Sequence, residues 1–112
     1  MIYDPKISDE EMIRILHERA KAGVEIRVIG QSEANLPVRK LSKLRLHTRV
    51  IVRDGRQAFI GSQSLRASEL DSRREVGLIV PDAKIVKKLI ETFESDWASS
   101  GIAKTGNGSA EK

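Results

Sequence analysis

Residues 46–64 read LHTRVIVRDGRQAFIGSQS, which is two apolar, β-rich runs on either side of the dipeptide Asp54-Gly55. An Asp-Gly pair between such runs is among the strongest short-range signals of a β-hairpin, because the tight turn demands positive φ. The run before the pair extends over residues 44–53 and the run after it over residues 57–60. The sequence therefore predicts an antiparallel hairpin that turns at Asp54-Gly55.

The residues before the hairpin predict an α/β unit. Residues 1–4 have strand character, and Ser8 with Glu11 has the pattern of a capping box, in which each side chain satisfies an amide at the start of a helix. The apolar residues of this helix recur at helical spacing on one face: Met12, Ile13, Leu16 and Ala20. Residues 24–29 alternate apolar and polar side chains, which predicts a strand, and the polar residues 30–37 predict a loop.

Another strand and another helix are expected after the hairpin. Residues 75–80 predict the strand, and Asp82 predicts the N-cap of the helix. The apolar face of this helix is formed by Ile85, Leu89, Phe93 and Trp97. We expect Trp97 to fill the core rather than to bind a ligand. The expected fold class is therefore α/β, with a mixed β-sheet flanked by α-helices.

Length and composition set the limits of the chain. Its 112 residues suffice for one domain, expected over residues 1–98. Residues 99–112 hold too little apolar surface to offset the entropy of ordering, which predicts a disordered tail. The absence of cysteine excludes a disulfide scaffold, a thiolate zinc site and a catalytic thiol. We expect no signal peptide and no transmembrane helix, because the longest apolar run, residues 76–80, is far too short.

The positive charge is concentrated in residues 39–56, which hold seven Lys or Arg against one Asp, a net charge of +6. Residues 1–38 carry a net charge of −2, and residues 57–112 are neutral. Phosphate, on a lipid head group or on a nucleic acid, is the natural partner of such a stretch because its charge and its hydrogen-bond donors coincide. The structural alternative is a solvated basic strand edge that discourages aggregation.

The hairpin region holds candidates for phosphate chemistry. His47 and Arg49 are two positions apart, so on a strand they project from the same face. Neutral imidazole is a capable nucleophile near neutral pH, and the neighbouring cation can hold anionic oxygens. Gly61 lets main-chain amides approach an anion, and the hydroxyls of Ser62 and Ser64 can donate to it. The pattern therefore predicts a phosphate site.

Two carboxylates are further candidates. Glu75 lies at the mouth of the last expected strand, where it can accept the second imidazole N–H and fix the tautomer that attacks. Asp54 is ambiguous, because an aspartate before glycine at a turn also has a purely structural explanation. His17, the other histidine, lies off the apolar face of its helix, and we expect it at the surface.

The spacing of these residues resembles the HKD motif of the phospholipase D superfamily, His-x-Lys-x4-Asp-x6-Gly-Ser-x-Asn. Its positions are occupied here, with both gaps matched, by His47, Arg49, Asp54, Gly61 and Ser62. Arg49 stands where the family has Lys, and Ser64 stands where it has Asn. Both replacements can donate to phosphate, although guanidinium and ammonium are not interchangeable. The flanks, residues 4–30 and 73–97, also resemble the segments that surround this motif in the family.

The resemblance implies phosphodiester hydrolysis or transphosphatidylation in two steps, without a metal or a cofactor. The histidine of one motif attacks phosphorus to form a phosphohistidine, and the histidine of a second motif protonates the leaving alcohol before it activates water or another alcohol. The implied catalytic residues are His47, Arg49, Asp54 and Glu75. The implied phosphate-binding residues are Arg49, Gly61, Ser62 and Ser64.

A single motif implies a partner. The second motif is expected from a homodimer or from another half of a longer polypeptide, and the start of the chain in a strand favours the longer polypeptide. Residues 61–75 look more like bacterial phospholipase D-like and cardiolipin-synthase-like proteins than like nucleases, which favours a phospholipid substrate. Two alternatives stay open: a nuclease, whose basic stretch would follow a nucleic-acid backbone, and a non-catalytic half that binds phosphate or a membrane. The expected location is the bacterial cytoplasm or the membrane periphery.

Overall fold

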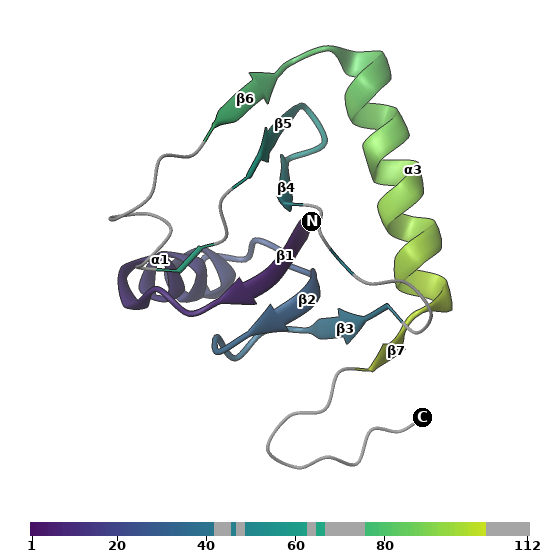
Figure 1. Ribbon diagram of the computed structural model, residues 1–112. Coiled ribbons are helices and arrows are strands. Elements are labelled where there is room, and N and C mark those ends of the chain that lie inside the picture. The colour runs from purple at the N-terminus through teal and green to yellow at the C-terminus, as the bar shows by residue number, and fades with distance from the viewer. Residues whose placement is uncertain (42–45, 47–48, 63–64, 67–75, 103–112) are drawn as a thin grey trace.

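The computed structural model describes residues 1–41, 46, 49–62, 65–66 and 76–102, and the statements below concern these residues (Figure 1). Within them, seven strands form one sheet, and two helices flank it. The strands are β1 (Ile2–Ile7), β2 (Val28–Ser32), β3 (Val38–Lys40), β4 (Arg49–Arg53), β5 (Gln57–Gly61), β6 (Gly77–Val80) and β7 (Gly101–Ile102), and the helices are α1 (Glu10–Lys21) and α3 (Ala83–Ser99).

The sheet is mixed, with the strand order β6-β5-β4-β1-β2-β3-β7. β1, β2 and β3 run parallel, whereas the other neighbouring pairs are antiparallel. Parallel neighbours need a crossover connection, and α1 provides the one between β1 and β2. The expected fold class, an α/β arrangement with a mixed sheet between helices, is confirmed.

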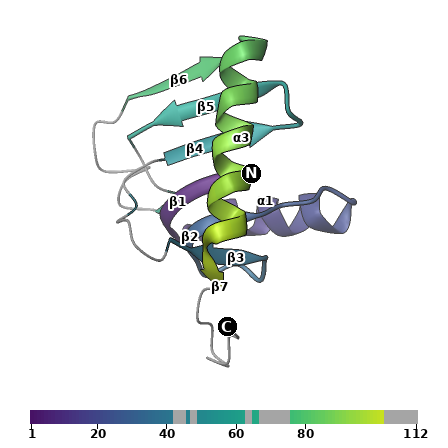
Figure 2. The ribbon, with the colours of Figure 1, turned by 90° about the vertical axis from the view of Figure 1, so that its right-hand side faces the viewer.

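Alternation along the strands sends side chains to two core layers, one on each face of the sheet. The layer under α3 buries Tyr3, Ile29, Val50, Val52, Ala58, Val86 and Phe93. The layer under α1 buries Ile2, Ile7, Ile26, Val28 and Leu65, with Met12, Ile13, Leu16 and Ala20 of the helix packed against them. Figure 2 shows α3 crossing in front of the strands. The chain is therefore a three-layer α/β/α sandwich.

Helix α3 begins where the sequence predicts it. One carboxylate oxygen of Asp82 accepts hydrogen bonds from the amides of Lys84 (2.9 Å) and Ile85 (3.1 Å), which lack partners within the helix. The buried face lies slightly off the expected one, because Val86 is 1% exposed while Ile85 is 48% exposed. Phe93 is buried as expected and meets the Tyr3 ring edge-on, with ring centroids 5.2 Å apart.

Trp97 packs against the core under α3, as expected. Its ring stacks on Phe93, with centroids 5.9 Å apart. The guanidinium of Arg39, from β3, lies 4.5 Å from the Trp97 ring centroid and donates a hydrogen bond to the Trp97 carbonyl (2.5 Å). A cation over an aromatic face adds electrostatic attraction to the packing. Arg39 therefore connects the C-terminal end of α3 to β3.

The predicted hairpin is present as β4 and β5. Asp54 and Gly55 have positive φ values of 54° and 66°, as the two central residues of a type I′ turn require. The Arg56 amide closes the turn by donating to the Arg53 carbonyl (3.0 Å). This turn has the right-handed twist of its strands, so local sequence is sufficient to specify it.

Some predicted boundaries were wrong in the first α/β unit. Strand β1 continues to Ile7, past the predicted end at residue 4, with a register shift between Asp4 and Ile7. The N-cap of α1 is Asp9, whose carboxylate accepts from the Met12 amide (3.0 Å), and not Ser8. Because Ser and Asp are both good N-caps, the sequence pattern does not distinguish these neighbouring positions.

The second strand was also predicted in the wrong place. β2 begins at Val28 rather than residue 24 and continues to Ser32, into the predicted loop. Its residues pair with β1, from Ile2↔Val28 to Ile7↔Ser32. Pairing with a central strand outweighs the weak strand propensity of the polar residues. The three-residue strand β3 was not predicted.

The end of the chain is only partly described. Helix α3 runs to Ser99, and β7 (Gly101–Ile102) pairs with β3, so both elements extend past residue 98, the predicted end of the domain. Residues 103–112 lie outside the described part, where the predicted disorder stays a prediction. Neither described helix is long and apolar enough to cross a membrane.

Candidate functional site

The ends of β4, β5 and β6 lie side by side at one end of the sheet. Arg49 begins β4 and pairs with Gly61, which ends β5, and Gly61 pairs with Gly77, which begins β6. On the other side of β4, Asp4 of β1 pairs with Gly30 of β2. We call this end of the sheet the motif edge. It is formed by residues of five neighbouring strands: Asp4, Gly30, Arg49, Gly61 and Gly77. It brings together residues that are far apart in the sequence.

Two predicted phosphate-binding residues, Arg49 and Gly61, lie together at the motif edge as Cα partners. The pairing of β1 and β4 ends at Tyr3↔Val50, and the next residues along the two strands are Asp4 and Arg49. A carboxylate and a guanidinium therefore come from adjacent strands at this edge. Arg49 is half-buried, and salt screens a half-buried charge less than a fully exposed one. Its attraction for an anion is therefore stronger than that of a fully exposed arginine.

Ser62, a third predicted phosphate ligand, is tied to the start of β6. Its amide donates to the Val76 carbonyl (3.0 Å), and its hydroxyl oxygen accepts from the Val76 amide (3.1 Å). The hydroxyl also donates to the Val76 carbonyl at 3.4 Å, which is a long hydrogen bond. The sequence did not predict this contact. For Ser62 to hold phosphate, its hydroxyl proton would exchange this weak acceptor for a phosphoryl oxygen.

Asp4 is a buried carboxylate at the motif edge, with 3% of its surface exposed. One of its oxygens accepts from the Lys6 amide (2.9 Å), and the other accepts from the Leu65 amide (2.9 Å). A buried carboxylate is costly unless hydrogen bonds compensate for lost water, and both oxygens are compensated here. Asp4 was not among the predicted site residues, because no motif surrounds it; the available signal was a charged residue directly after the apolar residues of the first predicted strand.

Gly30 is required where β2 reaches the motif edge. Its φ is 138°, and a Cβ atom on it would lie 1.8 Å from the Asp4 carbonyl oxygen and 3.0 Å from Leu46. The first distance is far inside van der Waals contact with backbone that cannot move aside. The absence of a side chain at Gly30 therefore allows the close approach of β1 and β2 beside Asp4.

Asp54 lies at the opposite end of the hairpin. Arg49 opens β4 at the motif edge, whereas Asp54 follows Arg53, the last residue of β4. At about 3.4 Å per residue, the five steps along the chain from Arg49 to Asp54 amount to about 17 Å of strand. The structure does not bring Asp54 to Arg49 and Gly61. The turn explains Asp54 fully, since its φ is positive and its carboxylate pairs with Arg53 (3.5 Å).

The other predicted site residues, His47, Ser64 and Glu75, lie outside the described residues. Their chain neighbours that are described are at or near the motif edge. Leu46 approaches Gly30, and Val76 is bonded to Ser62. The roles given to His47, Ser64 and Glu75 therefore stay predictions.

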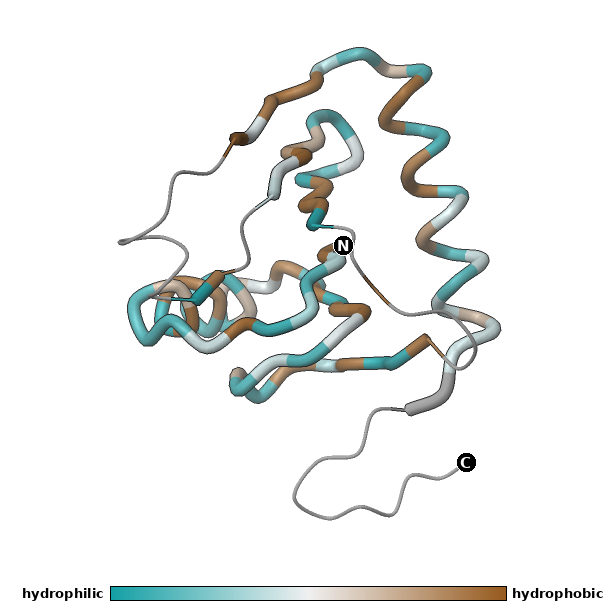
Figure 3. Tube along the Cα trace, viewed as in Figure 1, coloured by the Kyte–Doolittle hydropathy of each residue, from teal (hydrophilic) through white to brown (hydrophobic). Residues whose placement is uncertain are grey.

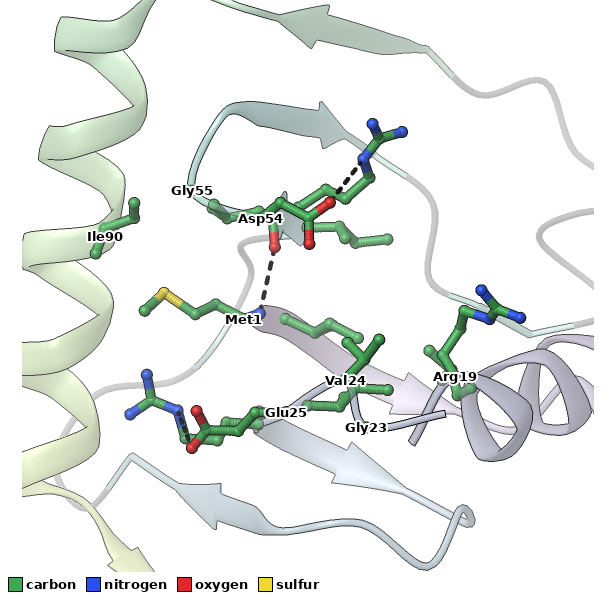
Figure 4. Close-up of a pocket in the computed structure, with 15 residues that line it drawn as sticks. Met1, Arg19, Gly23, Val24, Glu25, Asp54, Gly55 and Ile90 are labelled. Atoms are coloured by element: carbon green, nitrogen blue, oxygen red, sulfur yellow. Dashed lines mark hydrogen bonds and ion pairs between the residues drawn. The ribbon is translucent and has the colours of Figure 1, made fainter. Parts of the chain in front are cut away.

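A cavity of about 860 Å³ lies at the opposite edge of the sheet from the motif edge (Figure 4). It is lined by the start of β1, the hairpin turn and the chain between α1 and β2, with Met1, Val24, Asp54 and Gly55 among its residues. None of the residues that define the motif edge lines it. The cavity is therefore not the predicted phosphate site.

The structure divides the basic stretch, residues 39–56. Arg39 packs on Trp97, at the end of α3. Arg49 and Arg53 are at opposite ends of β4. The described cations of this stretch thus do not form one surface patch, and the net charge of the stretch overstates the field at any single point. Arg49 is the described cation of this stretch that lies at the motif edge.

Known structures share this fold. NucT from Helicobacter pylori aligns with a TM-score of 0.75 and 15% identity, covering 88% of this chain and 78% of that chain. Nuc from Salmonella typhimurium, a phospholipase D family member, aligns with a TM-score of 0.76 and 16% identity, covering 93% and 80%. Polyphosphate kinase from Porphyromonas gingivalis aligns with a TM-score of 0.72 and 23% identity, covering 87% and 17%. The fold is that of phospholipase D-like domains.

The family follows from the sequence match. Residues 31–97 match the family model described as cardiolipin synthase, PLD-like domain, and this segment includes the hairpin and the motif edge residues of β4 to β6. The chain belongs to this family, within the phospholipase D superfamily. A curated relative, polyphosphate kinase from Mycolicibacterium paratuberculosis, is 35% identical over an alignment of 101 residues, with 78% of this chain covered. The chain spans 14% of that relative's length.

Proposed function

We propose that this domain supplies one half of a site for phosphoryl-group chemistry of the phospholipase D type. The observation that carries the proposal is the pairing of Arg49 with Gly61 at the motif edge, next to Ser62. A guanidinium presents several N–H donors in a plane and binds phosphate oxygens at two points. The match of residues 31–97 to the family model supports the same assignment.

In the proposed reaction, His47 attacks phosphorus with a neutral ring nitrogen while the P–O bond to the leaving alcohol breaks. The histidine of a second motif gives its proton to that alcohol. Water or another alcohol then attacks the phosphohistidine, so that a new P–O bond forms while the P–N bond to His47 breaks, and the proton of the attacking group passes to the second histidine. Arg49, with the Ser62 hydroxyl, stabilises the charge on the phosphoryl oxygens, and Glu75 orients His47. Stabilisation of this kind is a major source of catalysis.

A phospholipid is the substrate class that we favour, because the matching family model is described as cardiolipin synthase. Hydrolysis and transfer to a second alcohol share the covalent intermediate and differ in the final acceptor. The second half of the site would come from a second copy of the chain or from another domain of a longer polypeptide. Such a protein would act in the bacterial cytoplasm or at the membrane periphery.

A specific observation favours a second candidate, phosphoryl transfer from a phosphoanhydride. The curated relative that is 35% identical to this chain is a polyphosphate kinase. The same residues would serve, because attack by histidine on phosphorus and stabilisation of phosphoryl oxygens are common to both reactions. A nuclease and a non-catalytic phosphate-binding half are the remaining alternatives.

The test is to trap the covalent intermediate. The chain, mixed with a second phospholipase D-like half, is incubated separately with phosphatidylglycerol vesicles, plasmid DNA and polyphosphate, quenched, and analysed by mass spectrometry for an adduct on His47. The expected result is an adduct with phosphatidylglycerol that is absent in His47→Gln. His17→Gln is the matched control, because His17 lies on α1 and accepts a hydrogen bond from the Asn35 amide (3.0 Å).

Each other outcome decides between the candidates. An adduct formed only with polyphosphate would replace the lipid by a phosphoanhydride, and one formed only with DNA would identify a nuclease. Turnover of any substrate that is unchanged in His47→Gln would remove His47 from the mechanism. Phosphate binding without any adduct or turnover, including when a second phospholipase D-like half is added, would identify a non-catalytic half.

A further inference from the structure

We propose that Asp4 is a positioning residue of the phosphate site: its buried carboxylate holds the chain that leaves β5, and so keeps Ser62 beside Arg49. This inference rests on the proposed function, because it assigns a role toward bound phosphate. Asp4 lies outside the family-model match, which begins at residue 31.

The long-range hydrogen bond of Asp4 is the first step. The bond to Lys6 is local and fits the irregular stretch of β1 that contains Pro5. The bond to the Leu65 amide, in contrast, joins residues 61 positions apart. A carboxylate that accepts from a buried amide makes a strong, charge-assisted bond. Asp4 therefore acts on a segment that its own strand does not otherwise specify.

The amide, the carbonyl and the side chain of Leu65 are all in contact with the rest of the domain. Its amide donates to Asp4, and its carbonyl accepts from the amides of Ser8 and Asp9, both at 2.9 Å. Its side chain is 8% exposed and belongs to the core layer under α1. Leu65 lies outside the sheet, so these contacts replace the ladder that fixes residues within strands. Leu65 is therefore bound both by β1 and by the residues that lead from β1 into α1.

The position of β4 explains how the hydrogen bond between Asp4 and Leu65 can affect the phosphate site. In the sheet, β4 lies between β5 and β1. Ser62 directly follows β5, and Leu65 is hydrogen-bonded to Asp4 of β1, so the two residues are held from the two strands on either side of β4. Arg49 is the first residue of β4. Ser62 can be no more than about 11 Å from Leu65, because three residues span at most that distance. Releasing Leu65 would free Ser62 from one side of Arg49.

The second anchor of Ser62 comes from the opposite side. Val76, at the start of β6, bonds the Ser62 amide and hydroxyl. Ser62 is thus held from the β6 side directly and from the β1 side through Leu65 and Asp4. A displacement of about 1 Å at a reacting group can reduce the rate by about a hundredfold, so losing one anchor is expected to affect binding and turnover.

The experiment measures binding of inorganic phosphate to the 112-residue chain by NMR, with the Gly61 and Ser62 amides as reporters. Asp4→Asn keeps the size of the side chain but replaces one acceptor by a donor, and Asp4→Ala removes both acceptors. We expect phosphate affinity to fall about tenfold in Asp4→Asn and further in Asp4→Ala. Hydrogen exchange of the Leu65 amide should accelerate in both variants, while exchange at Val50 stays unchanged.

The matched control is Asp82→Ala, which removes a helix cap at the opposite edge of the sheet. It lowers stability without touching the motif edge, so it should leave phosphate affinity unchanged at a temperature where all variants are folded. Equal losses of affinity in Asp82→Ala and Asp4→Asn would show that Asp4 acts only through stability.

Failure of this proposal is distinguishable from failure of the proposed function. If the wild-type chain binds phosphate and Asp4→Asn binds it equally well, the positioning role is overturned while the phosphate site stands. If the wild-type chain does not bind phosphate, the proposed function fails, and the role of Asp4 fails with it. If Asp4→Ala does not fold, Asp4→Asn still decides the question.

Discussion

Arg49 and Gly61 are Cα partners in the last pair of the β4–β5 hairpin, and the chain leaves the sheet one residue later, at Ser62. The hairpin turn is at the other end of these two strands. Because β4 and β5 are paired along their whole length, the first and last residues of the hairpin, Arg49 and Gly61, lie together at the motif edge. Arg53, on the same strand as Arg49, faces the turn instead. One strand thus provides both a candidate phosphate ligand and its matched control.

Replacing Arg49 should weaken anion binding, whereas replacing Arg53 should not. We expect Arg49→Met to lower the affinity for inorganic phosphate about tenfold or more, because a hydrogen bond to a charged group contributes about 1.5 to 3 kcal/mol. Arg49→Lys should keep part of the affinity, since it retains the charge and loses the planar donors. Calorimetric titration measures both. Equal weakening by Arg53→Met would mean that net charge alone attracts the anion.

Gly30→Ala should destabilise the chain severely. The new Cβ would meet the Asp4 carbonyl oxygen at 1.8 Å, in a backbone conformation that only glycine adopts readily. We expect a loss of about 3 kcal/mol or more in the free energy of unfolding, measured by urea titration. Gly23→Ala is the control, because Gly23 also has positive φ but nothing within 4 Å, so only a conformational cost of about 1 kcal/mol is expected. Similar losses at both positions would contradict the close approach of β1 and β2.

Tyr3 should make stability depend on alkaline pH. Burial, followed by the hydrogen bond that its hydroxyl donates to Asp96 (2.5 Å), raises the pKa of Tyr3 above its ordinary value of 10.0. The folded chain therefore holds this proton more tightly than the unfolded chain. The resulting stabilisation is fully present below pH 10 and is lost as pH rises above it, by up to about 1.4 kcal/mol per pH unit.

Tyr3→Phe tests this dependence. Urea unfolding between pH 8 and about pH 11.5 should show a steeper loss of stability in the wild type than in the variant. Other groups that titrate in this range contribute equally to both chains. Parallel curves would mean that Tyr3 ionises equally in the folded and unfolded states, which is incompatible with its burial against Phe93 and Asp96.

Charged residues on β6 should improve solubility without loss of stability. Leu78 and Ile79 are 64% and 69% exposed on this strand at the edge of the sheet, and Figure 3 shows the apolar character of β6. An apolar edge strand is a template for aggregation, and lysine blocks it. Leu78→Lys and Ile79→Lys should therefore reduce light scattering on concentration, with a change in unfolding free energy within about 0.5 kcal/mol. A large drop in thermal midpoint would show that these side chains are needed in the core.

The sequence was most informative where structure is local. Asp54-Gly55 predicted the turn because the dipeptide itself favours the required backbone, and Asp82 predicted the start of α3 because its carboxylate bonds amides two and three residues ahead. Prediction was weaker for β2 and missed β3, whose residues become strands through pairing with β1 and its neighbours. Such pairing is not encoded in the spacing of nearby residues.

The candidate site divides in the same way. The spacing in residues 47–64 was sufficient to identify the family and to select Arg49, Gly61 and Ser62, because a motif is a property of one continuous segment. The sequence did not separate Asp54 from them, although the hairpin places it at the far end. It also did not reveal Asp4, whose importance lies in a hydrogen bond across 61 residues.

The hairpin, the two helices, the α/β class and the family could be predicted from the sequence, since each depends on patterns within short stretches of chain. Which residues share the motif edge, which arginine of the basic stretch lies there, and what anchors Ser62 became known only from the folded chain, because burial and strand pairing act between residues distant in sequence. The environment of a side chain such as Asp4 therefore does not exist until the sheet has formed.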